Sequence, residues 1–164
     1  MVFSRVENLR LREEQEQVFF ELNEFVKRER ARRGTICLSG PHQSGKTTVL
    51  LYFLWKNNYP LNLYINANLF VINNLNKRKE LEEFSKLEHA TKKIIENLLR
   101  ELLNNHFLDH DIMILDSIEL LNAYNIDIVN LAWNCATDGK ICIISTPLPR
   151  SALNSNLCKI IELG

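Results

Sequence analysis

The stretch GPHQSGKT, residues 40–47, decides the fold of this chain. It fits the pattern G-x-x-x-x-G-K-[ST], in which two glycines let the backbone turn tightly and approach an anion closely. The apolar run TICLS precedes the stretch, and the apolar run TTVLLYFLW begins at its last residue. Strand, loop and buried helix are the context that this pattern requires. The stretch therefore predicts a phosphate-binding loop at the start of a helix.

The parts of this loop have separate roles in holding a triphosphate. The backbone amides from Gln43 to Thr48 would point at the β-phosphate from the positive end of the helix. Lys46 would add its charge to the β and γ oxygens, and the hydroxyl of Thr47 would complete the shell of a Mg²⁺ ion. Nucleotide contacts are thus expected from Gly40, Pro41, His42, Gln43, Ser44, Gly45, Lys46, Thr47 and Thr48.

Around the loop, short apolar runs alternate with stretches of helical periodicity. Strands are expected at residues 35–40, 61–69, 111–116, 140–146 and 157–164, and helices at residues 5–33, 46–55, 79–105 and 126–137. The central runs are almost wholly apolar, as strands are when both faces of a parallel sheet are covered. The sequence predicts one α/β domain, with a long amphipathic N-terminal helix in residues 1–34 and a core in residues 35–164. The Asn-rich stretch 57–76 is the most loop-like segment.

A second half of the site is expected at the end of another buried strand. Asp116 closes the run DIMILD and stands where an acid would hold the magnesium ion through water. The same residue could instead cap the following helix, because D-S-I-E is also a capping sequence. With the loop present, we favour the metal role.

The loop and Asp116 together resemble the additional-strand class of P-loop ATPases, which includes RecA-like and AAA-type cores; the loop is their Walker A motif. The resemblance covers residues 35–164. It implies a three-layer core with helices on both faces of a five-stranded parallel sheet in the order 5-1-4-3-2, residues 61–69 forming the outer strand. It also implies ATP and Mg²⁺ as cofactors, and a polar sensor for the γ-phosphate at the end of the fourth strand, where Ser145 and Thr146 stand.

A narrower resemblance is to the small P-loop proteins of BREX phage-defence systems, the BrxF family. Their motif order is GPxxSGKT, an LNL strand and LDNIELL. This chain has GPHQSGKT, LNLYINANL and LDSIELL in the same order. It departs from the family after residue 121, where the DPL and SRN stretch and the tyrosine-containing tail are missing. The resemblance implies larger protein partners in an antiviral defence complex of bacteria or archaea that acts at DNA.

Hydrolysis of ATP requires a carboxylate that orients or deprotonates water. In many AAA-type cores a glutamate directly follows the strand-ending aspartate, but here Ser117 stands there. In RecA-like cores the acid ends the outer strand, where this chain has Asn66 and Asn68. Glu119 is the remaining candidate, and it could equally be an ordinary residue of a capped helix. The sequence leaves open whether the chain is an ATP hydrolase.

Arg150 is the only arginine after residue 100. It stands near the place where AAA-type cores present an arginine finger to a neighbouring subunit of a homo-oligomer, although a solvated loop residue is an equal alternative. The sequence stops after its fifth strand, so a helical lid is not expected. These features favour slow or partner-dependent turnover over a self-sufficient motor.

Charge supports an alternative reading as a RecA-like accessory module that binds nucleic acid. The formal net charge is zero, with an excess of +5 in residues 1–100 and −5 in residues 101–164. The basic excess lies in the runs KRERARR (27–33) and KRK (77–79), which could also be solvated helix ends. DNA contacts would come from Lys27, Arg28, Arg30, Arg32 and Arg33.

Two further enzyme classes fit less well. A small-molecule kinase usually closes an arginine-rich lid over the phosphates, and the final third of the chain is poor in arginine. A GTPase would carry an NKxD-type segment that reads guanine, and none is present.

Cysteine use and hydropathy indicate a cytoplasmic protein. The four cysteines, Cys37, Cys135, Cys142 and Cys158, lack metal-ligand spacing and are expected to be small buried thiols in a reducing compartment. No apolar run approaches the roughly 18 residues of a membrane-spanning helix, and the N-terminus lacks the apolar segment of a signal peptide.

Overall fold

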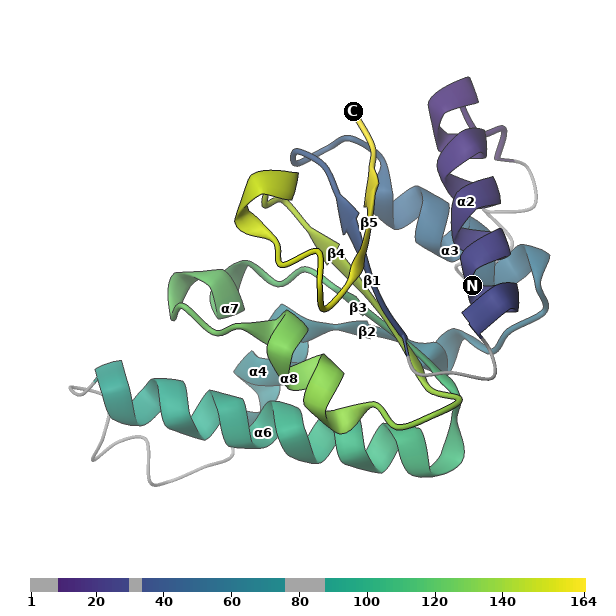
Figure 1. Ribbon diagram of the computed structural model, residues 1–164. Coiled ribbons are helices and arrows are strands. Elements are labelled where there is room, and N and C mark those ends of the chain that lie inside the picture. The colour runs from purple at the N-terminus through teal and green to yellow at the C-terminus, as the bar shows by residue number, and fades with distance from the viewer. Residues whose placement is uncertain (1–8, 30–33, 76–87) are drawn as a thin grey trace.

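Five parallel strands form one sheet at the centre of the computed structural model, which describes residues 9–29, 34–75 and 88–164 (Figure 1). The strand order is β2-β3-β4-β1-β5, which is the predicted order read from the other edge. The predicted α/β fold with a parallel sheet is confirmed. The strands are β1 (Gly34–Ser39), β2 (Tyr64–Asn66), β3 (Ile112–Asp116), β4 (Ile141–Thr146) and β5 (Lys159–Glu162).

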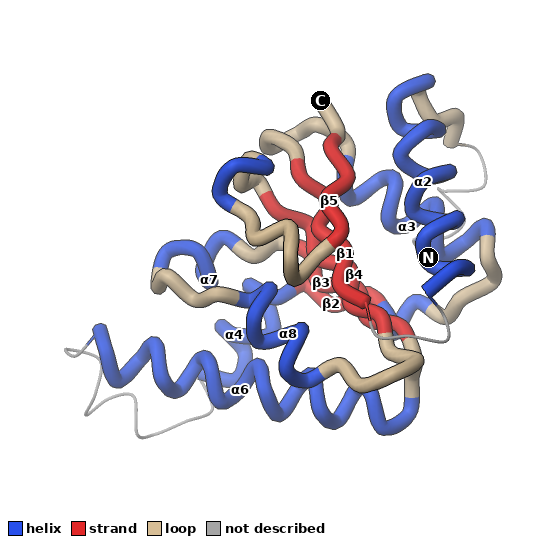
Figure 2. Tube along the Cα trace, viewed as in Figure 1, coloured by secondary structure: helices blue, strands red, loops and turns tan. Residues whose placement is uncertain are grey.

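Helices cover both faces of this sheet, so the molecule has three layers (Figures 1 and 2). One face carries α2 (Glu13–Glu29) and α3 (Lys46–Lys56). The other face carries α4 (Ala67–Leu75), α6 (Glu88–Asp109), α7 (Glu119–Ala123) and α8 (Ile128–Cys135). Two single turns of 3₁₀ helix, Leu61–Leu63 and Arg150–Ala152, connect the larger elements.

Alternation along the strands divides the core into two halves. On β3, Ile112 and Ile114 pack with α2 and α3, whereas Met113 and Leu115 pack with the helices of the other face. Because both faces of the strand are buried, the sequence reads as a continuous apolar run. The physical origin of the near-continuous apolar strands is therefore burial on two sides.

The N-terminal helix is confirmed where the structure describes it. Val18, Leu22 and Val26 recur at helical spacing on the buried face of α2. Its first turn is acidic and its last turn is basic, which complements the helix dipole at both ends. The remaining parts of the predicted helix 5–33 lie outside the described residues or in the loop before α2.

The predicted strand 61–69 is wrong in most of its length. A helical turn occupies Leu61–Leu63, β2 spans three residues, and α4 begins at Ala67. The side-chain Oδ1 of Asn66 accepts a hydrogen bond from the backbone N–H of Leu69 at 3.0 Å, and this cap starts the helix. Much of the stretch 57–76 is consequently helical, although composition predicted a loop.

Boundaries of other elements differ less from the prediction. The expected helix 79–105 is observed as α6, while residues 76–87 lie outside the described part of the chain. The expected helix 126–137 is observed as α8. The short helix α7 was not predicted as a separate element. Within the described residues, no helix is both long and apolar enough to cross a membrane.

The sheet register brings the functional ends of the strands together. Ser39 at the end of β1 pairs with Thr146 at the end of β4. Asn66 at the end of β2 pairs with Asp116 at the end of β3. All four residues therefore lie at the carboxyl edge of the sheet, where open α/β sheets bind their ligands.

Candidate phosphate-binding site

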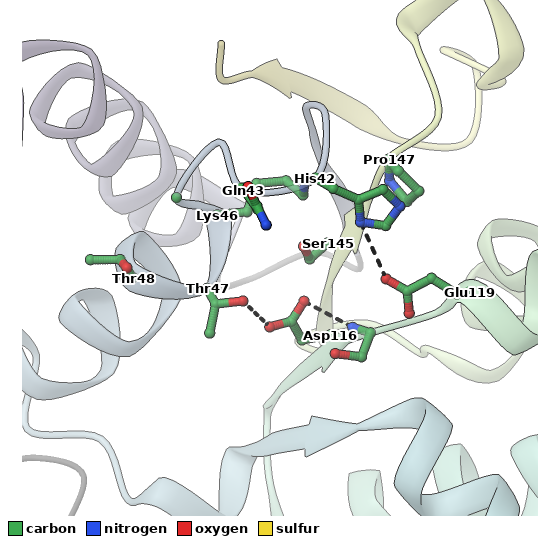
Figure 3. Close-up of a pocket in the computed structure, with 11 residues that line it drawn as sticks. His42, Gln43, Lys46, Thr47, Thr48, Asp116, Glu119, Ser145 and Pro147 are labelled. Carbon is green, nitrogen blue, oxygen red and sulfur yellow. Dashed lines mark hydrogen bonds and ion pairs between the residues drawn. The ribbon is translucent and has the colours of Figure 1, made fainter.

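A cavity of about 380 Å³ opens at the carboxyl edge of the sheet (Figure 3). The loop before α3, the end of β3, the start of α7 and the end of β4 surround it. Its lining residues are His42, Gln43, Gly45, Lys46, Thr47, Thr48, Asp116, Ser117, Glu119, Ser145 and Pro147. The tertiary structure thus brings most of the predicted loop residues together with three residues that were predicted from separate parts of the chain.

The loop has the tight backbone that the glycine pattern predicts. Gly45 has φ +95°, and Gln43 also has a positive φ, 63°. A Cβ at Gly40 would lie 2.1 Å from the carbonyl oxygen of Leu163, so the loop passes too close to the end of β5 for any side chain there. Gly40, Pro41 and Ser44 belong to the loop but do not line the cavity.

Lys46 places its amine against the loop. Its Nζ donates to the carbonyl oxygen of Gly40 at 2.5 Å and to that of Pro41 at 2.9 Å. The residue is only 9% exposed. Burial lowers the pKa of Lys46 below its ordinary value, and the negative charges of Asp116 and Glu119 partly oppose this effect. The site therefore holds a desolvated cation, which attracts an anion more strongly than a cation in water does.

Asp116 faces the loop. Its Oδ2 accepts hydrogen bonds from the hydroxyl of Thr47 at 2.6 Å and from the hydroxyl of Tyr64 at 2.5 Å. Its Oδ1 accepts from the N–H of Ser117 at 2.8 Å. The helix-capping alternative is not observed, because α7 begins after Ile118 without a side-chain cap.

Thr47 and Asp116 offer the hard oxygen donors that Mg²⁺ prefers. No group of three or more His, Cys, Asp or Glu side chains that could hold a metal occurs in the described parts of the chain. A hydroxyl ligand from Thr47, with Asp116 acting through water and the rest of the shell from phosphate and water, suits an ion that keeps several waters, so these residues fit Mg²⁺.

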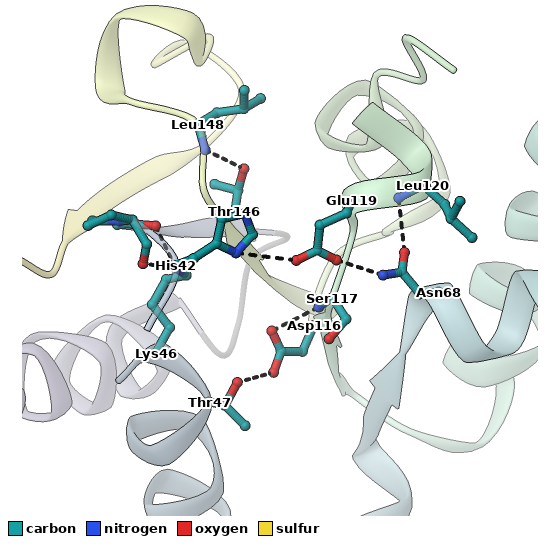
Figure 4. A network of polar contacts seen from close by, with 12 residues as sticks. His42, Lys46, Thr47, Asn68, Asp116, Ser117, Glu119, Leu120, Thr146 and Leu148 are labelled. Atoms are coloured by element: carbon teal, nitrogen blue, oxygen red, sulfur yellow. Dashed lines mark hydrogen bonds and ion pairs between the residues drawn. The ribbon is translucent and has the colours of Figure 1, made fainter. Parts of the chain in front are cut away.

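Glu119 lies across the cavity from the loop, held on two sides (Figure 4). Its Oε2 accepts from the side-chain amide of Asn68 at 2.7 Å, and its Oε1 lies 3.7 Å from Nδ1 of His42. The side-chain Oδ1 of Asn68 accepts from the backbone N–H of Leu120 at 3.0 Å. The backbone N–H of Asn68 donates to the carbonyl oxygen of Ser117 at 3.0 Å. Asn68 therefore ties the start of α4 to the segment that carries Glu119.

Ser117, between the two acids, has a left-handed backbone with φ 58°. This conformation is uncommon for residues other than glycine and costs free energy. The hydrogen bond from the backbone N–H of Asn68 to the carbonyl oxygen of Ser117 helps to hold this conformation. The strained residue lies in the cavity wall, and such strain often marks a functional site.

The two sensor candidates separate in the structure. Ser145 is buried and lines the cavity. Thr146 does not line it, and its hydroxyl accepts from the N–H of Leu148 at 3.1 Å. Arg150 also lies outside the cavity: its side chain pairs with Glu162 on β5, in a neighbouring hollow beside Gly40 and Pro41. Its role as a finger toward another subunit stays a prediction.

The predicted DNA contacts lie mostly outside the described residues. Arg30, Arg32, Arg33 and the run 77–79 belong to undescribed segments. Lys27 and Arg28 are exposed at the end of α2, and Arg28 approaches Glu24 at 3.9 Å.

Sequence reasoning missed several residues of the site. Tyr64, which contacts Asp116, and Arg12 and Gln15, which contact the loop, carry no motif. Asn68 was considered only because it stands where RecA-like cores have a catalytic acid. The alternation of LNLYIN around β2 was a usable signal for Tyr64, because a side chain two residues before the strand end points to the same face as the last one.

Comparison with known proteins shows which solved structures share this fold. No family model matches the chain, and no curated protein matches it. Among solved structures, domain III of the replication initiation protein DnaA from Thermotoga maritima is similar with a TM-score of 0.55 and 17% identity, covering 97% of this chain and 66% of that one. A DNA replication initiation factor is similar with a TM-score of 0.51 and 14% identity, covering 96% of this chain and 48% of that one.

This chain accordingly spans about half to two thirds of the length of these structures. At such low identities the likeness shows the fold alone, an AAA-like P-loop ATPase fold. The broader of the two sequence resemblances is confirmed at the level of the fold. The narrower one, to the BREX proteins, receives no support from these comparisons.

Proposed function

We propose that this chain binds Mg-ATP and acts as a slow or partner-dependent ATPase subunit of a larger complex. One observation carries the proposal: Lys46, Thr47 and Asp116 meet in one cavity at the N-terminus of a buried helix. Backbone amides, a desolvated ammonium group and a pair of hard oxygens form together the set of groups that a magnesium-bound triphosphate requires. The choice of ATP follows the sequence resemblance.

Each residue would contribute a separate part of binding. Thr47 and Asp116 would hold Mg²⁺, which neutralises charge on the β- and γ-phosphates when it is bound. Lys46 would move from the loop carbonyls of Gly40 and Pro41 toward phosphate oxygens. Ser145, which lines the cavity, would sense the far end of the triphosphate.

The surroundings of Glu119 support slow turnover. A carboxylate that activates water must be free to contact that water, and a hydrogen bond donated by a neighbouring side chain occupies the accepting oxygen. Here Asn68 donates to one oxygen, and His42 lies near the other. A partner that moved either neighbour would release the carboxylate, which is why we propose partner dependence.

The larger complex, an arginine finger from Arg150 in a homo-oligomer, and a role in phage defence are proposals that rest on the sequence resemblance. The two similar structures belong to proteins named for the initiation of DNA replication, and both are longer than this chain. An association with a DNA-acting assembly is compatible with these likenesses and with the basic run at 27–33.

Binding is tested by titrating ATP with Mg²⁺ into the wild type, Lys46→Ala and Lys56→Ala in a calorimeter. Lys56 ends the same helix α3 but lies outside the cavity, so it is a matched control. We expect binding by the wild type and by Lys56→Ala, and none measurable by Lys46→Ala. Absence of heat in the wild type, or equal affinities in all three proteins, would contradict the proposal.

Turnover is tested by phosphate release from the wild type and Glu119→Gln, with and without duplex DNA. Glu21→Gln, on the exposed side of α2, is the control. We expect a slow rate in the wild type, a rate at least about tenfold lower in Glu119→Gln, and no change in the control. A Glu119→Gln variant as fast as the wild type would exclude Glu119 as the catalytic acid.

A further inference from the structure

A buried glutamine interrupts the apolar stripe of the N-terminal helix. Gln15 lies in the first turn of α2 and is 6% exposed, on the face that continues with Val18 and Leu22. A buried amide is costly unless it is hydrogen-bonded. The amide caps the start of α2 by accepting from the backbone N–H of Arg12, and its second polar atom is directed elsewhere.

The amide of Gln15 is bonded on one side to its own helix and directed on the other side toward the phosphate-binding loop. Its Oε1 accepts from the N–H of Arg12 at 2.9 Å, and its Nε2 lies 3.5 Å from the carbonyl oxygen of Gly45. A Cβ at Gly45 would lie 2.3 Å from this Nε2. Gly45 is therefore a glycine for two reasons, its positive φ and the space that Gln15 occupies.

Arg12 makes a second contact with the same loop. Its Nη2 donates to the carbonyl oxygen of Ser44 at 2.9 Å. Two consecutive carbonyl groups of the loop, those of Ser44 and Gly45, are thus held by side chains from the start of α2. Both contacts join parts of the chain about 30 residues apart.

Peptide geometry gives these contacts a consequence inside the cavity. In a trans peptide unit the C=O and the following N–H point in opposite directions, and the described residues contain no cis bond. A carbonyl of Ser44 held toward α2 turns the N–H of Gly45 away from α2. The carbonyl of Gly45 also accepts the first hydrogen bond of α3, from the N–H of Val49 at 3.2 Å, so the contact with Gln15 adds to the direction that the helix gives to the N–H of Lys46. Gly45 and Lys46 both line the cavity.

We propose that Arg12 and Gln15 are positioning residues, which hold the loop amides of Gly45 and Lys46 in the orientation that binds phosphate. This inference rests on the proposed function. The two side chains touch no phosphate; they raise the fraction of molecules whose loop is ready to bind. The apparent Kd is the intrinsic Kd divided by this fraction, so loss of the contacts weakens binding.

The proposal also couples α2 to the nucleotide. Coupling between two equilibria is reciprocal. A nucleotide that requires the loop held by Arg12 and Gln15 must therefore stabilise α2 in its docked position. A role of Gln15 in folding alone would produce no such coupling. The two roles therefore differ in what ATP does to α2.

The test measures the Kd for ATP with Mg²⁺ by calorimetry and the stability without nucleotide by urea denaturation. The variants are Arg12→Ala, Gln15→Leu and the control Val18→Ala. Gln15→Leu keeps the buried volume but loses the amide, and Arg12→Ala removes the guanidinium of an exposed residue. Val18→Ala removes a buried contact of the same helix that does not touch the loop.

We expect Kd to rise about five- to tenfold in Arg12→Ala and in Gln15→Leu, as the loss of one hydrogen bond predicts. In Val18→Ala, in which α2 stays docked and both loop contacts remain, we expect lower stability with an unchanged Kd. As a second readout, ATP should slow hydrogen exchange of the amides of residues 13–22 in the wild type and much less in Gln15→Leu.

Suppose that the wild type binds ATP and Lys46→Ala does not, with Kd unchanged in both Arg12→Ala and Gln15→Leu. This result would contradict the positioning role of Arg12 and Gln15 and would leave the proposed function supported. A rise in Kd in Val18→Ala as large as that in Gln15→Leu would also contradict the positioning role, because lost stability would then explain both. A wild type that binds no ATP would contradict both the positioning role of Arg12 and Gln15 and the proposed function.

Discussion

Asp116 and Glu119 are three positions apart, yet single contacts give them different surroundings. Asp116 is 5% exposed and receives two hydroxyl donors on one oxygen. Glu119 is more exposed and is held by an amide and approached by a histidine. The left-handed Ser117 separates them and turns the chain between the two carboxylates. At this scale the site consists of one buried acid suited to a cation and one accessible acid suited to water.

The same Tyr64 hydroxyl that donates to Asp116 is itself affected by the contact. Burial, followed by the neighbouring carboxylate, raises the pKa of Tyr64 above its ordinary value. The phenol therefore remains a donor throughout the physiological pH range. Because it stays protonated, it can hold Asp116 Oδ2 without adding a negative charge beside that carboxylate.

Replacement of Asn68 tests the hold on Glu119. In Asn68→Ala, the N–H of Leu120 loses its acceptor and Glu119 loses its donor. We expect the free energy of unfolding to fall by about 1–2 kcal/mol. We also expect faster ATP turnover, because the freed carboxylate can turn toward the attacking water. Denaturant titration and phosphate release measure the two effects.

Asn74→Ala is the matched control for this change. Asn74 lies on the same helix, and its amide donates to the carbonyl of Phe70 within α4, at 2.8 Å. It should lose less stability and leave turnover at the wild-type rate. Equal turnover in Asn68→Ala and the wild type would show that Asn68 does not restrain the acid.

At the scale of elements, short contacts at helix ends determine where the strands stop. Asn66 ends β2 by capping α4, and Asn68 then links α4 to the start of α7. On the opposite edge, the last turn of α6 is joined to β3 through His106. Its Nε2 donates to the carbonyl of Ile112 at 2.8 Å.

The contact of His106 predicts a pH dependence of stability. Burial, with a smaller contribution from His110 and Lys140, lowers the pKa of His106, although its bond to Ile112 and the charge of Asp109 act in the opposite direction. The unfolded chain then binds a proton more readily than the folded chain near pH 6. The stability that depends on neutral His106 is therefore present above the unfolded pKa of about 6.5 and is lost as the pH falls.

We expect the free energy of unfolding of the wild type to decrease between pH 7.5 and pH 5.5, and to decrease less in His106→Gln. Glutamine retains an N–H donor for Ile112 but does not titrate in this range. Asn104→Gln, which changes an exposed residue of the same helix that does not titrate, should retain the wild-type slope. Urea denaturation at the two pH values measures this, and parallel slopes in all three proteins would disprove the assignment to His106.

At the scale of the whole molecule, one ligand would contact segments from most of the chain. The loop after β1, the end of β3 and the end of β4 line one cavity, and α2 contacts the loop from outside. A ligand that binds only this assembled arrangement must stabilise the entire fold by mass action.

Thermal unfolding measures this stabilisation. ATP with Mg²⁺ at a hundred times its Kd should add about 2.7 kcal/mol, which for a chain of this size raises the Tm by roughly 5–10 °C. Chelation of Mg²⁺ should reduce the shift, because Thr47 and Asp116 then lose the ion that joins them to the nucleotide. Lys46→Ala should show no shift. An equal shift with and without Mg²⁺ would contradict the assignment of the metal ligands.

The order of the sheet followed from the family resemblance, whereas the sequence by itself determined the loop and the strands that end at Asp116 and Thr146. Each depends on neighbouring residues or on a continuous apolar run, and such features are readable in one dimension. The length of β2 was not readable, because LNLYINANL suits a strand and a helix start equally well until Asn66 caps the helix.

Only the tertiary structure decided which side chains support the site. Tyr64 meets Asp116 and Asn68 meets Glu119 across about 50 positions, and Arg12 reaches Ser44 across 32. None of these partners has a local pattern that marks it. Their contacts exist because parallel strands align their carboxyl ends and a helix packs across the loop, which depends on the three-dimensional register and not on spacing in the chain.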